Sequence, residues 1–215
     1  MNLHETRHHE GMHPTRPVVT EYVVLVGEDG RAVGTALKST VHTTCTPLHL
    51  AFSCYVFNSR GEVLITERAH EKKTWPAVTT NTCCGHPGPN ESLADAVVRR
   101  LEQELGIAVD GVRLLLPDFR YRAVMDDGVV ENELCPVYGV LYDGPAPTPD
   151  PAEVARAEWI SWREFSRFVD EGGAVSPWCR EQMPRLRALG ENPADWPSGD
   201  SANLPPAARS VGNPG

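Results

Sequence analysis

Short apolar segments separated by polar turns fill much of the chain between residues 22 and 141. Segments of this length, joined by turns rich in Gly, Asn, Asp and Ser, are typical of β-hairpins. We therefore expect three hairpins, which pair residues 22–26 with 31–37, 50–57 with 63–67, and 119–125 with 130–141. A further strand is expected near residues 158–161.

Helical periodicity is clearest between residues 92 and 105, before Gly106. Apolar side chains recur there every four residues, at Leu93, Val97, Leu101 and Leu105. Two further helices are expected near residues 162–171 and 177–189, and the proline-rich segment 144–151 predicts a loop. Strands interleaved with a few helices predict an α+β fold in which helices sandwich a mixed β-sheet.

Both ends of the chain lack this patterning. The length of 215 residues fits one domain, which we assign to residues 18–190. Residues 191–215 are rich in Pro, Gly, Ser and Ala and predict a flexible C-terminal tail. Residues 1–17 predict a flexible N-terminal tail that holds four of the eight histidines, His4, His8, His9 and His13. These histidines bind metal loosely at most, because no pattern around them fixes a geometry.

Charge and cysteine content narrow the class of protein. Twenty basic residues against 29 acidic ones give a net charge of −9, which argues against a nucleic-acid partner. The apolar stretch 22–26 is far shorter than the roughly 18 residues that a membrane span needs. Six cysteines without a secretory leader are typical of thiols in a reducing compartment. We expect a cytoplasmic protein without a membrane partner.

A loop followed by a glutamate-rich helix carries the first chemical motif. Its spacing resembles the Nudix box, whose helical carboxylates gather magnesium around a diphosphate because hard cations prefer oxygen ligands. The matching residues are Gly85, Glu91, Arg99, Glu104, Gly106 and Ile107. The chain departs from the box at Arg100 and Gln103, where hydrolases of this superfamily have glutamates. Only Glu104 of the helical carboxylate cluster remains, so we expect a hydrolytic site with several magnesium ions to be disabled. A Nudix diphosphohydrolase stays open as an alternative.

Further motifs resemble one branch of that superfamily, the type 1 isopentenyl-diphosphate isomerases, over roughly residues 21–190. Several independent motifs in the right order are more specific than any one of them. They are VHTTCTPLHLAF, ERAHEKKTWP, TNTCCGHP, RRLEQELG, PDFRYRA, ENELCP and SPW. One departure is Thr79, which stands where the family usually has an aromatic residue.

The resemblance implies a metal site with three imidazoles and two carboxylates. The ligands that it assigns are His42, His49, His86, Glu131 and Glu133. Glu131 and Glu133 are two residues apart, so on a strand both face the same side. A mixed nitrogen and oxygen site suits Mn²⁺, Mg²⁺ or Zn²⁺. His70 matches no family ligand, and we expect it on the surface.

The resemblance also implies how the substrate is held and converted. It makes Glu133 the acid and Cys84 the base of a double-bond shift, with Tyr121 near the acid and the Trp178 ring over the reacting carbons. A metal-bound Glu133 is the stronger acid, and Cys84 is a base only where positive charge lowers its pKa. The diphosphate is expected at Lys38, Arg68, Lys72 and Arg100. A Mg²⁺ ion that accompanies it is expected at Glu104 and the backbone carbonyl of Cys84.

Each assignment has an ordinary alternative. The lysines can be surface charges, Trp178 can anchor a helix, and Cys83 is expected to pack as a small apolar residue. An inactive metal-binding module is a third candidate, although such a module is expected to lose Cys84 or Glu133. The sequence favours isomerisation of isopentenyl diphosphate to dimethylallyl diphosphate. We expect this reaction to serve isoprenoid biosynthesis and the protein to be a monomer.

We expect deletion of residues 1–17 to leave both metal content and isomerase activity nearly unchanged, because the expected ligands all lie downstream. Metal analysis and a product assay on the purified truncated and full-length proteins check this. Loss of bound metal from the truncated protein would show that the tail histidines contribute.

Overall fold

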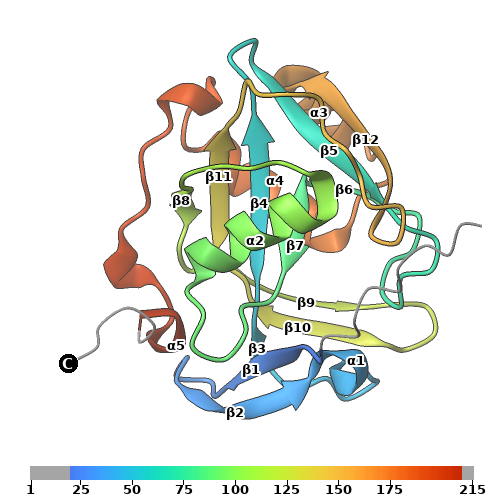
Figure 1. Cartoon of the computed structure of the whole chain (residues 1–215), viewed down its shortest axis with the longest axis vertical. Coiled ribbons are helices and arrows are strands. Elements are labelled where there is room, and N and C mark those ends of the chain that lie inside the picture. Colours follow the sequence, from blue (N-terminus) through green and yellow to red (C-terminus); the bar gives the residue numbers. More distant parts are fainter. Residues whose placement is uncertain (1–19, 210–215) are drawn as a thin grey trace, which may run out of the picture.

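Two β-sheets form the framework of the protein in a computed structural model that describes residues 20–209 (Figure 1). The first sheet has the strand order β2-β1-β3-β10-β9. Its strands are β1 Tyr22–Val26, β2 Ala32–Leu37, β3 His49–Leu50, β9 Arg120–Val124 and β10 Val130–Leu134. The pairing of β1 with β2 and of β4 with β5 confirms two of the expected hairpins.

The second sheet has the order β12-β5-β4-β11-β8, with β6 beside β5 and β7 beside β4. Its strands are β4 Phe52–Phe57, β5 Glu62–Arg68, β6 Thr79–Thr80, β7 Cys83–Gly85, β8 Arg113–Leu116, β11 Val137–Leu141 and β12 Val154–Ser161. Because β11 runs parallel to β4 while β5 runs antiparallel to it, this sheet is mixed, as expected.

Two chain segments pass from one sheet into the other side by side. Strands β3 and β4 are nearly continuous, and so are β10 and β11, and the two segments run parallel. The Ala51 amide donates to the Leu134 carbonyl at 2.9 Å, and the Ser53 amide donates to the Pro136 carbonyl at 3.1 Å. The expectation of one strand over 130–141 is therefore wrong. Pro136 has no N–H for a ladder, and the chain changes sheets there.

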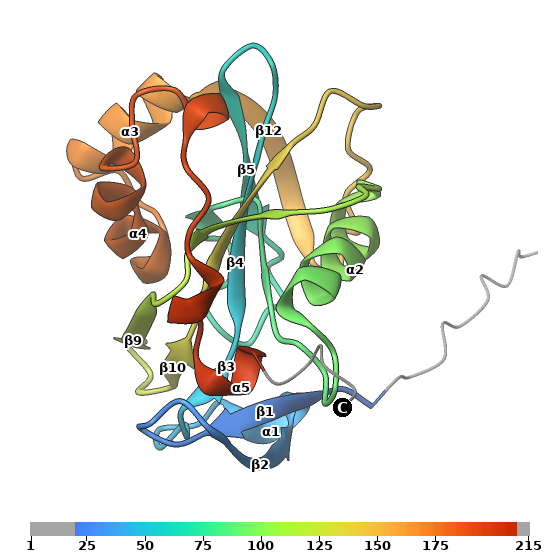
Figure 2. The ribbon, with the colours of Figure 1, turned by 90° about the vertical axis from the view of Figure 1, so that its left-hand side faces the viewer.

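Helices cover both faces of the second sheet (Figure 2). Helix α2, Leu93–Leu105, lies on one face, and α3, Trp162–Asp170, and α4, Pro177–Arg187, lie on the other. The hydroxyl of Ser92 caps α2 by accepting from the Asp95 amide, and Gly106 ends it with a left-handed φ of 64°. The helices and the α+β sandwich are thus confirmed.

The C-terminal region departs from the sequence-based expectation of a flexible tail over 191–215. Residues 190–209, which we call the C-terminal strap, include the 3₁₀ helices Pro193–Asp195 and Ser201–Asn203 and helix α5, Pro206–Arg209. Trp196 is only 2% exposed, and its ring centroid lies 5.3 Å from those of Phe57 and Trp162. Burial of a large aromatic side chain fixes the strap to the core.

Polar contacts fasten the strap along its length. The guanidinium of Arg113 donates to the carbonyls of Pro193, Ala194 and Trp196. Farther on, the Ala207 amide donates to the Gly30 carbonyl at 2.9 Å, in the turn between β1 and β2. Gly30 has a φ of 73°, and a Cβ there would lie 2.8 Å from Pro206. The strap therefore joins the two sheets. Residues 1–17 and 210–215 lie outside the described residues.

The length and composition of the helices decide whether one of them could span a membrane. Within residues 20–209, no helix is long and apolar enough to cross a bilayer. Helix α1, Lys38–Val41, which connects β2 to the loop before β3, is a single short turn.

We expect Trp196→Ala to lower the free energy of unfolding by about 3–5 kcal/mol, because it removes a buried ring between two aromatic partners. Denaturant unfolding of the variant and the parent protein measures this. Trp196→Phe keeps an aromatic ring at this position but loses the indole hydrogen bond to the Gly190 carbonyl, so we expect a smaller loss of stability. An unchanged stability of Trp196→Ala would restore the flexible-tail interpretation.

Candidate active site

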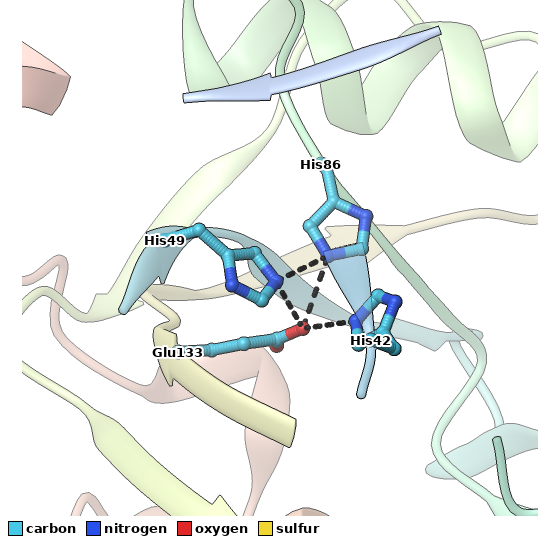
Figure 3. Close-up of side chains that lie close together, drawn as sticks. All are labelled: His42, His49, His86 and Glu133. Atoms are coloured by element: carbon cyan, nitrogen blue, oxygen red, sulfur yellow. Dashed lines mark hydrogen bonds and ion pairs between the residues drawn. The ribbon is translucent and has the colours of Figure 1, made fainter. Parts of the chain in front are cut away.

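Three imidazoles and one carboxylate converge at the junction of the two sheets (Figure 3). The Nε2 atoms of His42, His49 and His86 lie 4.0, 3.3 and 3.0 Å from Oε1 of Glu133. All four ligand atoms lie within 4.8 Å of one another. The structure therefore brings together four of the five residues expected to hold the metal.

Strand pairing explains why distant residues meet here. His49 on β3 and Glu133 on β10 are register partners in the parallel pair, while His86 directly follows β7 and His42 directly follows α1. The loop that carries His42 is held by the buried hydroxyl of Thr46, which lies 2.8 Å from the Thr43 amide and 2.6 Å from the Val130 carbonyl. Nothing in the local sequence pattern singles out Thr46.

The donor set fits a divalent metal. His49 Nδ1 lies 2.9 Å from the Pro47 carbonyl, and its Nε2 atom faces His86 Nε2 at 3.2 Å. His42 Nε2 is buried without a hydrogen-bond partner among the described residues. A shared cation would satisfy the two facing ring nitrogens and the orphaned buried nitrogen, and a backbone carbonyl on the far ring nitrogen is typical of metal-binding histidines.

Electrostatics within the cluster follow from burial and proximity. Burial alone raises the pKa of Glu133, but the proximity of the three histidine rings outweighs it and holds that pKa well below its usual range. Burial lowers the pKa of His86 to about 3, so this ring is neutral. Burial also acts to lower the pKa of His49, but Glu133 reverses the shift, so the net change is upward. Metal binding competes with this proton because the ligand is the neutral ring.

Glu131 lies beside the cluster rather than in it. The Tyr121 hydroxyl lies 2.6 Å from Oε2 of Glu131 and 2.8 Å from Oε2 of Glu133, so it connects the two carboxylates. Both glutamates are 5% exposed, which confirms that β10 turns them to the same, buried side. Burial and the neighbouring Glu133 raise the pKa of Glu131. Its role as a fifth metal ligand stays a prediction.

Cys84 lies on β7 opposite Ser53 of β4. Its sulfur is 3.4 Å from the Ser53 hydroxyl and 3.3 Å from Oδ1 of Asn81. Burial raises the pKa of this thiol to about 12, although hydrogen bonds and the Arg68 charge act against the shift. The residues around Cys84 therefore hold it as a neutral thiol, and they do not meet the condition for a base that the sequence analysis set.

Trp178 forms an aromatic wall with its neighbours. Its indole N–H donates to Oδ1 of Asn81 at 3.0 Å, and its ring centroid lies 5.6 Å from those of Trp75 and Tyr121. The Arg68 guanidinium lies 5.5 Å from the same ring. Asn81 thus links Trp178 to Cys84. The run TNTCCGHP contains Asn81, but no periodicity marked it as a positioning residue.

A cavity of about 590 Å³ unites these groups. Most of the expected site residues line it: Lys38, His42, Arg68, Lys72, Cys84, His86, Arg100, Tyr121, Glu131, Glu133 and Trp178. His49 lies behind the lining and is fully buried, and Glu104 is engaged by Arg100, whose Nε lies 2.7 Å from its carboxylate. His70 is exposed, 3.9 Å from Glu67.

Two carboxylates that the sequence analysis missed also line the cavity. Glu21 accepts from Lys38 Nζ at 2.7 Å. Glu153 accepts from Lys72 Nζ and lies 3.2 Å from Nη2 of Arg100. The basic end of the cavity is therefore internally paired.

Comparison with known proteins places this geometry in a class. The sequence matches the NUDIX domain over residues 47–179, and the protein is thus a Nudix protein. DR0079 from Deinococcus radiodurans aligns with a TM-score of 0.61 at 20% identity, over 77% of this chain and 98% of that one. The MutT protein from Methanosarcina mazei Go1 aligns with a TM-score of 0.53 at 17% identity, over 65% and 92% of the two chains. These structures share the fold.

Sequence relatives are more specific. The chain is 56% identical over 189 residues to the isopentenyl-diphosphate Delta-isomerase of Saccharopolyspora erythraea, which covers 87% of this chain and 97% of that one. It is 50% identical over 190 residues to the protein of the same name from Rhizobium rhizogenes, which covers 88% and 91%. The chain belongs to the isopentenyl-diphosphate Delta-isomerase family of Nudix proteins.

We expect His86→Ala to lower the metal content of the purified protein strongly, because it removes one of four converging ligand atoms. His70→Ala is the matched control, since it removes an exposed imidazole outside the cluster. Metal analysis after dialysis against trace metal measures both. Equal metal content in the two variants would exclude the cluster as the binding site.

Proposed function

We propose that this protein interconverts isopentenyl diphosphate and dimethylallyl diphosphate by paired proton transfers. The observation that carries the proposal is that Cys84 and Glu133 line one cavity together with the Trp178 ring. The relatives are named as Delta-isomerases of isopentenyl diphosphate. The diphosphate end of such a molecule suits the basic residues that line the same cavity, Lys38, Arg68, Lys72 and Arg100.

The reaction sets demands that this cavity can meet. One proton is added to a carbon and another is removed nearby, so a tertiary carbocation or a cation-like state must be stabilised. Such a state needs an acid, a base, a negative ring face and little free water. Trp178, at 2% exposure, is placed to offer the ring face, and Tyr121 and Trp75 pack around it.

In this proposal Cys84 and Glu133 move the two protons. Cys84 holds a proton before substrate binds and the Glu133 carboxylate does not, so Cys84 donates one proton to carbon and Glu133 accepts the other, and the roles are exchanged in the reverse reaction. Asn81 and Ser53 fix the direction of the Cys84 sulfur. Tyr121 orients Glu133 through its hydroxyl. The three histidines and Glu133 would hold a divalent metal, whose positive charge would lower the proton affinity of Glu133 and so make its protonated form the stronger acid of the reverse reaction.

Several finer assignments belong to the same proposal. Mn²⁺, Mg²⁺ and Zn²⁺ are all compatible with the nitrogen and oxygen donors. Glu131 is proposed as a further ligand of that metal. Glu104 and the backbone carbonyl of Cys84 are proposed to hold the Mg²⁺ that accompanies the diphosphate. We further propose a cytoplasmic monomer that serves isoprenoid synthesis.

A Nudix diphosphohydrolase is the second candidate, because the fold and the anion-binding residues are shared. Its helical carboxylates are reduced here: Arg100 and Gln103 replace two of them, and Gln103 Oε1 accepts from Arg99 at 3.3 Å. Glu104 is paired with Arg100. These contacts favour isomerisation over activation of water.

We expect the metal-loaded protein in D₂O with Mg²⁺ to convert isopentenyl diphosphate into dimethylallyl diphosphate with the diphosphate intact. Deuterium is expected on carbon, since the donated proton exchanges with solvent. Mass spectrometry and NMR of the products measure both. Release of phosphate or isopentenyl monophosphate would identify a hydrolase, and unaltered substrate would identify an inactive module.

We expect Cys84→Ala and Glu133→Gln each to reduce kcat by at least about 10²–10⁴-fold in that assay, because each removes one partner of the proton exchange. The two losses should not add in the double variant. Cys45→Ser, which alters an exposed thiol, is the control and should keep activity. Near-normal isomerisation by Cys84→Ala would refute the proposed acid–base pair.

A further inference from the structure

Glu153 occupies the place where a diphosphate is expected to contact the protein. It lies just before β12, and its two carboxylate oxygens engage different cations of the cavity wall. Oε2 accepts from Lys72 Nζ, and Oε1 lies 3.2 Å from Nη2 of Arg100. The side chain is 25% exposed, so it can still be reached from the cavity.

Backbone contacts fix the loop that carries this carboxylate. The Ala69 amide donates to the Glu153 carbonyl at 3.0 Å, next to the end of β5. On the other side, the Thr148 and Asp150 amides donate to the carbonyls of Leu105 and Glu104, at the C-terminal end of α2. The carboxylate therefore has a defined position between Lys72 and Arg100.

Glu153 is charged throughout the working range of pH. Burial acts to raise its pKa, but Arg100 and Lys72 outweigh burial and lower the pKa to about 2. A neighbouring cation of the cavity, Lys38, is paired in the same way, because its Nζ atom lies 2.7 Å from the Glu21 carboxylate. Three of the four expected diphosphate-binding cations thus have a protein carboxylate as partner before any ligand binds.

A diphosphate that binds these cations must replace Glu153 or accept its repulsion. Two anions that compete for one pair of cations cannot both have short contacts to it without a large electrostatic cost. In the ligand-free protein, the carboxylate has the opposite effect, because unpaired buried or half-buried cations are unstable. Arg100, which is 5% exposed, also has the Glu104 carboxylate as a partner, whereas Lys72 is paired with Glu153.

We propose that Glu153 is a positioning residue that acts as an internal counter-ion, which holds Lys72 and Arg100 in the binding geometry and is displaced by the diphosphate of substrate or product. It therefore weakens diphosphate binding and allows the product to leave. The proposal rests on the proposed function only for the identity of the ligand, a diphosphate ester with a divalent cation.

The test uses Glu153→Gln, which keeps the shape and hydrogen-bonding capacity of the side chain and removes its charge. We expect the Kd for inorganic diphosphate at fixed Mg²⁺, measured by calorimetry on the full-length protein, to fall about tenfold, equivalent to about 1.4 kcal/mol. Glu71→Gln is the matched control, because Glu71 lines the same cavity and is exposed. Its Kd should change far less.

Either of two results would overturn the proposal. Weaker binding by Glu153→Gln, together with a higher Mg²⁺ requirement, would make Glu153 a ligand of the accompanying metal. An unchanged Kd would mean that Glu153 does not compete with the diphosphate. Thermal unfolding of the variant confirms that the protein tested is folded.

A double-mutant cycle separates competition from a merely structural role. If Glu153 shields Lys72, then Lys72→Gln should weaken diphosphate binding more in the Glu153→Gln background than in the parent protein. Additive effects of the two substitutions on the binding free energy would contradict displacement of Glu153 by the diphosphate. With isopentenyl diphosphate, KM of Glu153→Gln should fall while kcat does not rise. If Glu153→Gln binds inorganic diphosphate more tightly but the parent protein fails to isomerise isopentenyl diphosphate, the proposed function is refuted and this inference stands.

Discussion

Glu133 is a carboxylate buried among three imidazole rings, and a buried charge is tolerated only where surrounding groups compensate it. The partners come from the end of α1, from β3 and from the loop after β7. The chain must bring all of these to one point. The parallel pairing of β3 with β10 does so for His49, and the continuation of both strands into the second sheet sets Cys84 close by. The junction of the sheets and the reaction centre are therefore a single structural feature.

The cavity beside this centre has two chemically distinct ends. One end has the aromatic rings of Trp178 and Tyr121 and the groups proposed to move protons. The other end has the basic residues, each held by a carboxylate or a carbonyl: Lys38 by Glu21, Lys72 and Arg100 by Glu153, and Arg68 by the backbone at Thr74 and Trp75. An acidic protein with a net charge of −9 thus presents a locally basic surface without leaving its cations uncompensated.

Local patterns predicted those parts of the structure that local interactions determine. The helix over 92–105 was predicted with its terminal glycine, because periodicity and helix termination both act within a turn or two. The motifs gave most of the cavity lining. By contrast, the sheet change at Pro136 depends on a neighbouring strand, and Trp196 stands in a proline-rich segment whose composition is that of a tail. Glu21, Glu153 and Ser53 were missed because their partners are distant in sequence, and a single carboxylate or hydroxyl has no periodicity. Asn81 was missed because its link to Trp178 spans the chain, although Cys84 is only three residues away.

The C-terminal strap links the order of synthesis to the completion of the molecule. Its last helix is bonded to the turn at Gly30, in the β1–β2 hairpin, which is synthesised well before the strap. That hairpin joins β3 through the pairing of Leu25 with His49. Contacts between such remote segments form late, since the whole intervening chain must be ordered first. In a nascent chain, the β1–β2 hairpin therefore stays without this contact until the residues of α5 have emerged.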